Sequence, residues 1–74
     1  MDHICYHART HIILGIGPNA EIAIVDARYN ANDPDVDTSA WRTAQATNEL
    51  IDRVHAQGGD CDWTVDRNTG VASV

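Results

Sequence analysis

Apolar and polar positions alternate along much of the chain, and this pattern favours short strands. Residues 2–8, DHICYHA, alternate between apolar and polar side chains, as a half-buried strand does. The stretches 11–16 and 21–27 are rich in β-branched residues. Between them, residues 15–19, GIGPN, have the composition of a turn. We therefore predict a strand at 2–8, followed by a β-hairpin made of 11–16 and 21–27.

One segment, 38–57, predicts a helix. Its apolar residues recur at steps of three and four, which places them on one stripe. Asp37 or Thr38 can cap the start of this helix, and Gly58 can end it. We expect the stripe to pack against branched residues of the predicted strands, among them Ile12, Leu14, Ile22 and Ile24. The stripe consists of Ala40, Trp41, Ala44, Thr47, Leu50, Ile51 and Val54.

The C-terminal third predicts two more strands. Residues 60–66, DCDWTVD, alternate strictly between polar and apolar, and 71–74, VASV, reads as a short edge strand. At 74 residues, the chain is expected to form one domain, 1–74. The predicted fold class is α+β: an antiparallel sheet of four or five strands with one helix, 38–57, packed on one face. The predicted order of elements is β-β-β-α-β-β.

The net charge of the chain and its lack of long apolar runs limit the kinds of partner that it is expected to bind. The formal net charge is −6, and all five basic residues are arginines. Direct binding to nucleic acid is therefore disfavoured, because phosphate contacts need clustered Lys and Arg. No apolar run approaches the 18 or so residues of a membrane span, and the N-terminus does not resemble a signal peptide. We expect a cytoplasmic protein, in the host cytoplasm if a phage encodes it, that does not bind membranes.

Carboxylates gather in two short runs. The first run alternates in the loop before the predicted helix, where helix capping and the helix dipole explain part of it. The second falls at even spacing in the predicted strand 60–66. Its side chains would project from one face at steps of about 6.6–6.8 Å. The two runs are Asp33, Asp35 and Asp37, and Asp60, Asp62 and Asp66.

Such an acidic surface favours a protein partner that has a basic surface. Regularly spaced carboxylates can occupy a groove that otherwise binds nucleic-acid phosphates. Small acidic α/β proteins encoded by phages, including some anti-CRISPR proteins, act in this way, and this chain is similar to them in size and charge. We predict a non-enzymatic, acidic protein-binding module that inhibits a nucleic-acid-binding complex, with both acidic runs and Tyr29 in the contact. Ordinary solubility is the alternative explanation of the carboxylates.

The N-terminal segment offers the ligand types that zinc prefers. His3, Cys5 and His7 share one face of the predicted strand, and His11 could approach them after a bend. The spacing H-x-C-x-H-x₃-H matches no common zinc module, so we expect neither a metal nor a cofactor. A small zinc-binding domain that uses these four residues is the main alternative function.

Other motifs are incomplete. The run 33–37 begins like a calcium-binding EF-hand loop, but it lacks the Gly and Glu that such a loop requires further on. The pair Gly15-x-Gly17 lacks a third glycine, and we expect Glu21 to begin a strand, so we assign the pair to a turn. No complete catalytic set is present, and we do not expect an enzyme. A homodimer that pairs through an edge strand or a free sheet face is a further alternative.

Overall fold

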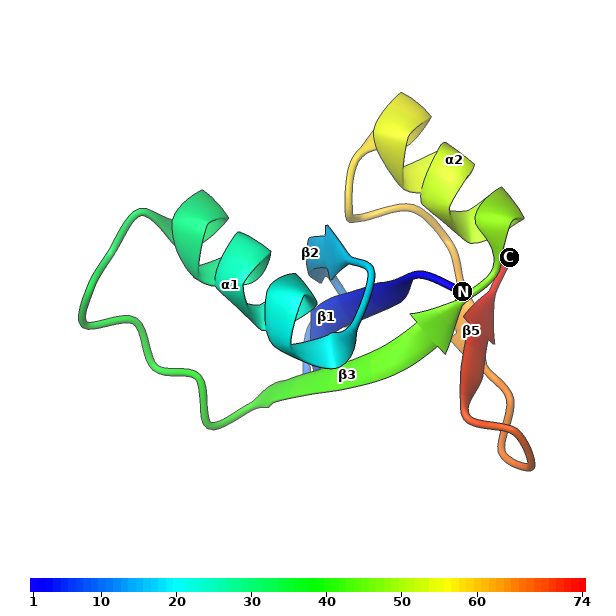
Figure 1. Cartoon of the computed structure of the whole chain (residues 1–74), viewed down its shortest axis with the longest axis horizontal. Coiled ribbons are helices and arrows are strands. Elements are labelled where there is room, and N and C mark those ends of the chain that lie inside the picture. The colour runs from blue at the N-terminus through cyan, green and yellow to red at the C-terminus, as the bar shows by residue number, and fades with distance from the viewer.

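The computed structural model describes all 74 residues as two helices packed on a five-stranded mixed sheet (Figure 1). The strand order is β2-β1-β3-β5-β4, and all neighbours are antiparallel except β3 and β5. The α+β class and the mostly antiparallel sheet are confirmed, but the single helix and the element order are wrong. The elements are β1 His3–His7, β2 Ile13–Gly17, α1 Ala20–Ala31, β3 Trp41–Ala46, α2 Asn48–Gln57, β4 Thr64–Val65 and β5 Val71–Ser73.

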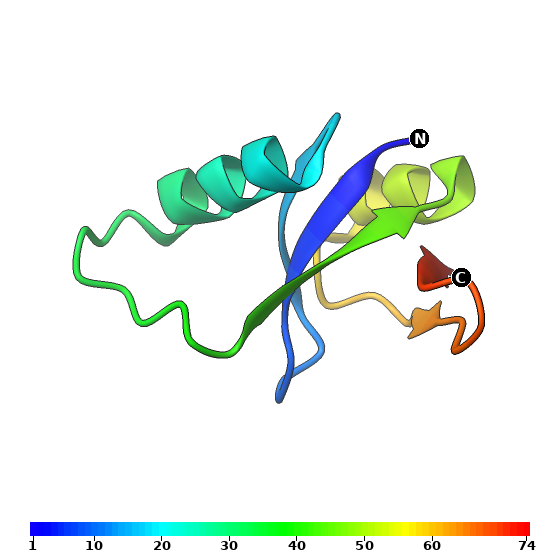
Figure 2. The ribbon, with the colours of Figure 1, turned by 60° about the horizontal axis from the view of Figure 1, so that its bottom comes forward.

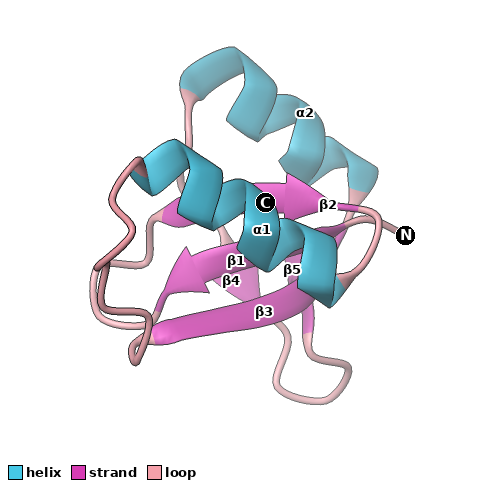
Figure 3. Cartoon of the chain, turned by 60° about the vertical axis from the view of Figure 1, so that its left-hand side comes forward, coloured by secondary structure: helices cyan, strands magenta, loops and turns pink.

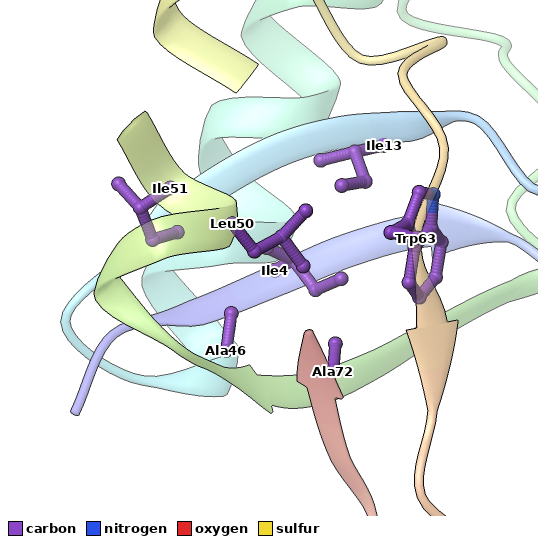
Figure 4. Packing of buried hydrophobic residues seen from close by; sticks show 7 residues of the cluster. All are labelled: Ile4, Ile13, Ala46, Leu50, Ile51, Trp63 and Ala72. Carbon is purple, nitrogen blue, oxygen red and sulfur yellow. The ribbon is translucent and has the colours of Figure 1, made fainter. Parts of the chain in front are cut away.

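Both faces of the sheet carry a helix, and α1 and α2 lie on the two sides of β1 (Figure 2). Ile4 and Cys5, adjacent in β1, are both fully buried, and successive strand residues point to opposite faces. Figure 4 shows the larger cluster, on the α2 side: Ile4, Ile13, Ala46, Leu50, Ile51, Trp63 and Ala72. The smaller cluster, on the α1 side, contains Cys5, Ala23 and Ala27, with Leu14, Ile24 and Trp41 packed against it.

Residues 20–31 form a helix, so the strand predicted at 21–27 and its hairpin are wrong. The Asn19 side chain caps the helix by accepting a hydrogen bond from the Ile22 N–H at 2.9 Å. The apolar residues of α1 occur on more than one side, because Ala23 is buried while Val25 is 58% exposed. That distribution hides the helical period, and the β-branched residues then suggest a strand. The actual partner of β2 is β1.

The helix predicted over 38–57 is divided into β3 and α2, and only its second half is confirmed. Thr47 separates the two elements, and its hydroxyl accepts from the Leu50 N–H at 3.3 Å as the N-cap of α2. Trp41 and Ala44 lie three residues apart, so a helix would place them on one face. In the structure Trp41 packs on the α1 side and Ala44 on the α2 side, as strand alternation requires.

The segment 60–66 keeps the predicted alternation but not the predicted strand. Its odd-numbered residues are buried or half-buried and its even-numbered residues are exposed, yet only Thr64–Val65 pairs with a neighbour. Strand β5 lies between β3 and β4, so its predicted place at the sheet edge is wrong. Ile12 and Ile22, which were expected in the core, are 38% and 45% exposed.

Helix α1 lies directly on β2 because two glycines leave room for it. A Cβ atom at Gly15 would overlap the Ala23 carbonyl oxygen and the Ala27 nitrogen, and one at Gly17 would come within 2.7 Å of the Ala23 nitrogen. The assignment of Gly15-x-Gly17 to a turn is therefore wrong, as is the expectation that no helix follows it. Both glycines belong to β2, and close helix–sheet packing accounts for them.

The outer edge of β2 is closed by hydrogen bonds from outside the sheet. The Asp26 carboxylate accepts from the Ile16 N–H at 2.9 Å, and the Asn30 amide donates to the Leu14 carbonyl at 2.9 Å. The Ile13 N–H donates to the carbonyl of Gly59 at 2.8 Å. These bonds take the place of a neighbouring strand. A dimer that paired through β2 would have to break all three.

Candidate functional site

Three of the four residues of the alternative zinc site, Cys5, His7 and His11, have different surroundings. Cys5 is buried beneath α1, and its burial raises the pKa of the thiol. The His7 ring accepts through Nδ1 from the backbone N–H groups of Arg9 and Thr10, at 3.2 and 3.3 Å, and so closes the β1–β2 turn. No three His, Cys, Asp or Glu side chains lie close enough together to hold a metal ion. The structure thus does not bring the predicted ligands together.

His11 belongs to an aromatic cluster that the sequence does not indicate. Its ring stacks on Trp63 with centroids 3.7 Å apart and an interplanar angle of 12°, and the Tyr6 ring meets Trp63 edge-on. The His11 Nε2 donates to the Trp63 carbonyl at 2.9 Å, and the Trp63 indole N–H donates to the His11 carbonyl at 2.9 Å. These two hydrogen bonds between distant segments hold the residues before β4 against the β1–β2 turn.

The second acidic run does not line up on a strand. Asp60 and Asp62 are exposed in the segment between α2 and β4, whereas Asp66 begins the turn from β4 to β5. The Asp66 carboxylate accepts from the N–H groups of Asn68 and Thr69, at 2.7 and 3.1 Å. These bonds lower the pKa of Asp66. Of the three carboxylates, Asp66 therefore has a structural role in the turn.

The first acidic run lies in the loop between α1 and β3 and caps no helix, so the predicted capping role is wrong. Asp33 accepts from the Asp35 N–H at 2.9 Å, and Asp37 accepts from the Ser39 N–H at 2.9 Å. The hydrogen bonds with Ser39, together with the nearby charges of Arg9 and His7, lower the pKa of Asp37. These bonds shape the loop and leave all three carboxylates exposed.

The two acidic runs belong to different parts of the chain, and the second run is itself divided between the segment before β4 and the β4–β5 turn. In Figures 1 and 2 the loop between α1 and β3 forms one end, and the β4–β5 hairpin forms the other. The longest dimension of the chain is 32 Å. The helix start that was predicted beside the first run is therefore wrong, because β3 and not a helix follows that loop. The residue of the predicted contact that does adjoin the first run is Tyr29, in the last turn of α1.

An exposed apolar stripe on α1 is a surface that the strand prediction for 21–27 does not anticipate. Ile22, Val25 and Tyr29 are 45%, 58% and 82% exposed. Their spacing of three and four residues places them on one side of the helix, away from Ala23 and Ala27. In Figure 3 this helix lies in front of the sheet with one side open. The three- and four-residue spacing of Ile22, Val25 and Tyr29 is present in the sequence, but a strand prediction for 21–27 does not use it.

Comparisons with known proteins found no relative of this chain. No family model matches the sequence, and no match was found among curated proteins or among solved structures. None of the helices has the length and apolar character needed to cross a membrane. The candidate site is accordingly defined by the stripe Ile22, Val25 and Tyr29 and by the acidic loop that follows it.

The lowered pKa values of Asp37 and Asp66 predict a specific acid sensitivity. A carboxyl whose pKa is lower in the folded than in the unfolded state stabilises the fold above the unfolded value of about 3.9. That contribution is lost as the pH falls through the folded value. We expect a D37N/D66N variant to lose less stability than the wild type between pH 5 and pH 2, as measured by urea midpoints. Asp52→Asn on α2 is the control, and an identical loss in wild type and double variant would contradict the prediction.

Proposed function

We propose that this chain is a non-enzymatic, acidic protein-binding module that docks through the outer side of α1. The observation that carries the proposal is the exposed stripe Ile22, Val25 and Tyr29. Apolar side chains at these spacings are the anchors of a helix that lies in a groove of another protein. Tyr29 is the most exposed of the three, and tyrosine is among the residues that contribute most to binding energy.

The negative charge of the loop that follows the stripe indicates what kind of partner surface would fit. Residues 32–39, which follow α1, contain three aspartates and no basic residue. A groove with an apolar floor and a basic rim at one end would complement both parts of this surface. The net charge of −6 would attract such a partner over a distance and make the association rate fall with added salt.

A basic groove of this kind occurs on proteins that bind nucleic acid. Occupation of the groove would exclude the nucleic acid, so the module would act as an inhibitor. This finer assignment rests on the charge of the chain and on its size, and it is testable once a partner is in hand. Asp60 and Asp62 remain a second candidate contact, because they are exposed and carry no hydrogen bond that shapes a turn.

The stripe can be tested by truncation. A V25A/Y29A variant is expected to bind its partner at least about 30-fold more weakly, because two anchor side chains are removed. The partner is captured from host lysate on immobilised wild-type protein and identified, and affinities are then measured by calorimetry. Ile12→Ala, at an exposed apolar residue outside α1, is the matched control. Equal affinity of wild type and the double variant would exclude the stripe as the contact.

Charge reversal separates the two acidic surfaces. An Asp35→Lys variant should slow association and weaken its salt dependence, and Asp62→Lys makes the same change of charge in the segment between α2 and β4. Asp33, Asp37 and Asp66 are left intact because their carboxylates accept hydrogen bonds from backbone N–H groups. If only Asp62→Lys reduces binding, the contact lies in the segment before β4 and the α1 surface is excluded.

A further inference from the structure

A positively charged hollow lies between α1 and the first residues of β3. Its volume is about 460 Å³, within the range of small-ligand sites. Two of the five basic residues of the chain line it, and no carboxylate does, although the net charge of the protein is −6. The lining residues are Ile24, Arg28, Thr38, Trp41, Arg42 and Thr43.

The backbone holds Arg42 in place without neutralising it. Its Nη1 donates to the carbonyls of Ser39 and Trp41, at 3.0 and 2.8 Å. Carbonyl groups orient the guanidinium but carry no negative charge, so the full positive charge stays available to a ligand. Arg28 comes from the last turn of α1 on the other side of the hollow. The two arginines that line the hollow thus come from separate elements.

The nearest aspartate in sequence does not cancel this charge. Asp37 adjoins Thr38, but its carboxylate is turned to the Ser39 N–H. The charges that lower the pKa of Asp37 are those of Arg9 and His7, not those of the hollow. No carboxylate is among the residues that line the hollow beside the two arginines.

We infer that this hollow binds a phosphate monoester. Arginine matches phosphate in geometry and can form two parallel hydrogen bonds to it, and two guanidinium charges balance a phosphate dianion. The hydroxyls of Thr38 and Thr43 are further donors, and Trp41 provides an apolar wall for a flat group attached to the phosphate. The inference does not rest on the proposed protein contact, because different side chains form the two surfaces.

Nuclear magnetic resonance can test the site on the intact protein. Inorganic phosphate and phenyl phosphate are titrated into ¹⁵N-labelled protein at constant ionic strength and pH. The chain has two tryptophans, so its two indole N–H signals act as an internal comparison. We expect the Trp41 indole and the Thr43 amide to shift and saturate. The Trp63 indole, which is hydrogen-bonded to His11 on the other face of the sheet, should stay in place.

Matched arginine variants decide between a site and a general charge effect. Arg28→Gln should weaken binding by about tenfold or more, since a charged hydrogen bond is lost. Arg53→Gln, an exposed position on α2 outside the hollow, makes the same change of charge and should have no effect. Arg42→Gln repeats the test from β3, with the amide spectrum as the check that β3 remains folded. Equal weakening by Arg28→Gln and Arg53→Gln would overturn the inference.

The probes also distinguish the source of the phosphate. Tighter binding of phenyl phosphate than of inorganic phosphate would support a ligand with a flat group against Trp41. Equal binding would support recognition of the phosphate alone. Benzoate that bound as tightly as phenyl phosphate would overturn the assignment to phosphate, as would the absence of any saturable shift at Trp41.

Discussion

Replacing Gly15 by alanine is expected to lower the free energy of unfolding by about 3 kcal/mol, at the upper end of the usual cost of overpacking. The added Cβ would overlap the carbonyl oxygen of Ala23 and the nitrogen of Ala27, and it would lie 2.9 Å from the Ala27 Cα. All three are backbone atoms, so no side-chain rotation can relieve the overlap. Helix α1 would have to move away from β2, and the small cluster around Cys5 would loosen.

Thermal unfolding measures this effect directly. For a chain of this size, a loss of about 3 kcal/mol corresponds to a fall in Tm of at least about 10 °C. The control is Gly70→Asn. Gly70 has a φ of 73°, which asparagine tolerates, and an added Cβ would meet no atom within 4 Å. A Gly15→Ala protein with the wild-type Tm would mean that α1 does not lie directly on β2.

Replacing Trp63 by alanine should also destabilise the protein strongly, by about 3–5 kcal/mol. Trp63 is 7% exposed and is the largest side chain of the main cluster. The change removes its stacking on His11, its edge contact with Tyr6 and its indole hydrogen bond to the His11 carbonyl. The segment before β4 would then lose its attachment to the β1–β2 turn.

Urea denaturation checks this prediction, with two comparison variants. Trp63→Phe retains an aromatic ring but not the indole N–H, so its free energy of unfolding should fall between wild type and Trp63→Ala. Ile22→Ala removes an apolar side chain that is 45% exposed, and it should change stability by about 0.5 kcal/mol or less. Similar losses for Trp63→Ala and Ile22→Ala would show that Trp63 does not anchor the core.

Helix α1 connects the stability of the fold with both proposed binding surfaces. Its inner side packs on Gly15 and Gly17, its outer side carries the stripe Ile22, Val25 and Tyr29, and its last turn contributes Arg28 to the hollow. A substitution under α1 would therefore affect the stability of the fold, the stripe and the hollow together. Variants on the outer side and at Arg28 leave the inner contacts intact, which is why they are the informative tests of binding.

Local pattern in the sequence was enough to locate some elements of the fold. The alternation in 2–8 located β1, and the burial alternation of 60–66 was correct for Trp63. The stripe containing Leu50 and Ile51 located α2, with Gly58 as its C-cap. In each case local periodicity and the burial of the side chains point to the same structure. Composition likewise determined the acidic character of the surface.

Long-range packing and strand pairing determine the secondary structure of two segments and the position of the candidate site. Residues 20–31 are rich in β-branched residues but form a helix, because Gly15 and Gly17 let Ala23 and Ala27 pack closely on β2. Residues 41–46 have helical spacing but form a strand, because β1 pairs with them along its whole length. Packing and pairing with distant residues outweigh local preference at both places. The same contacts separate the two acidic runs and expose the outer side of α1.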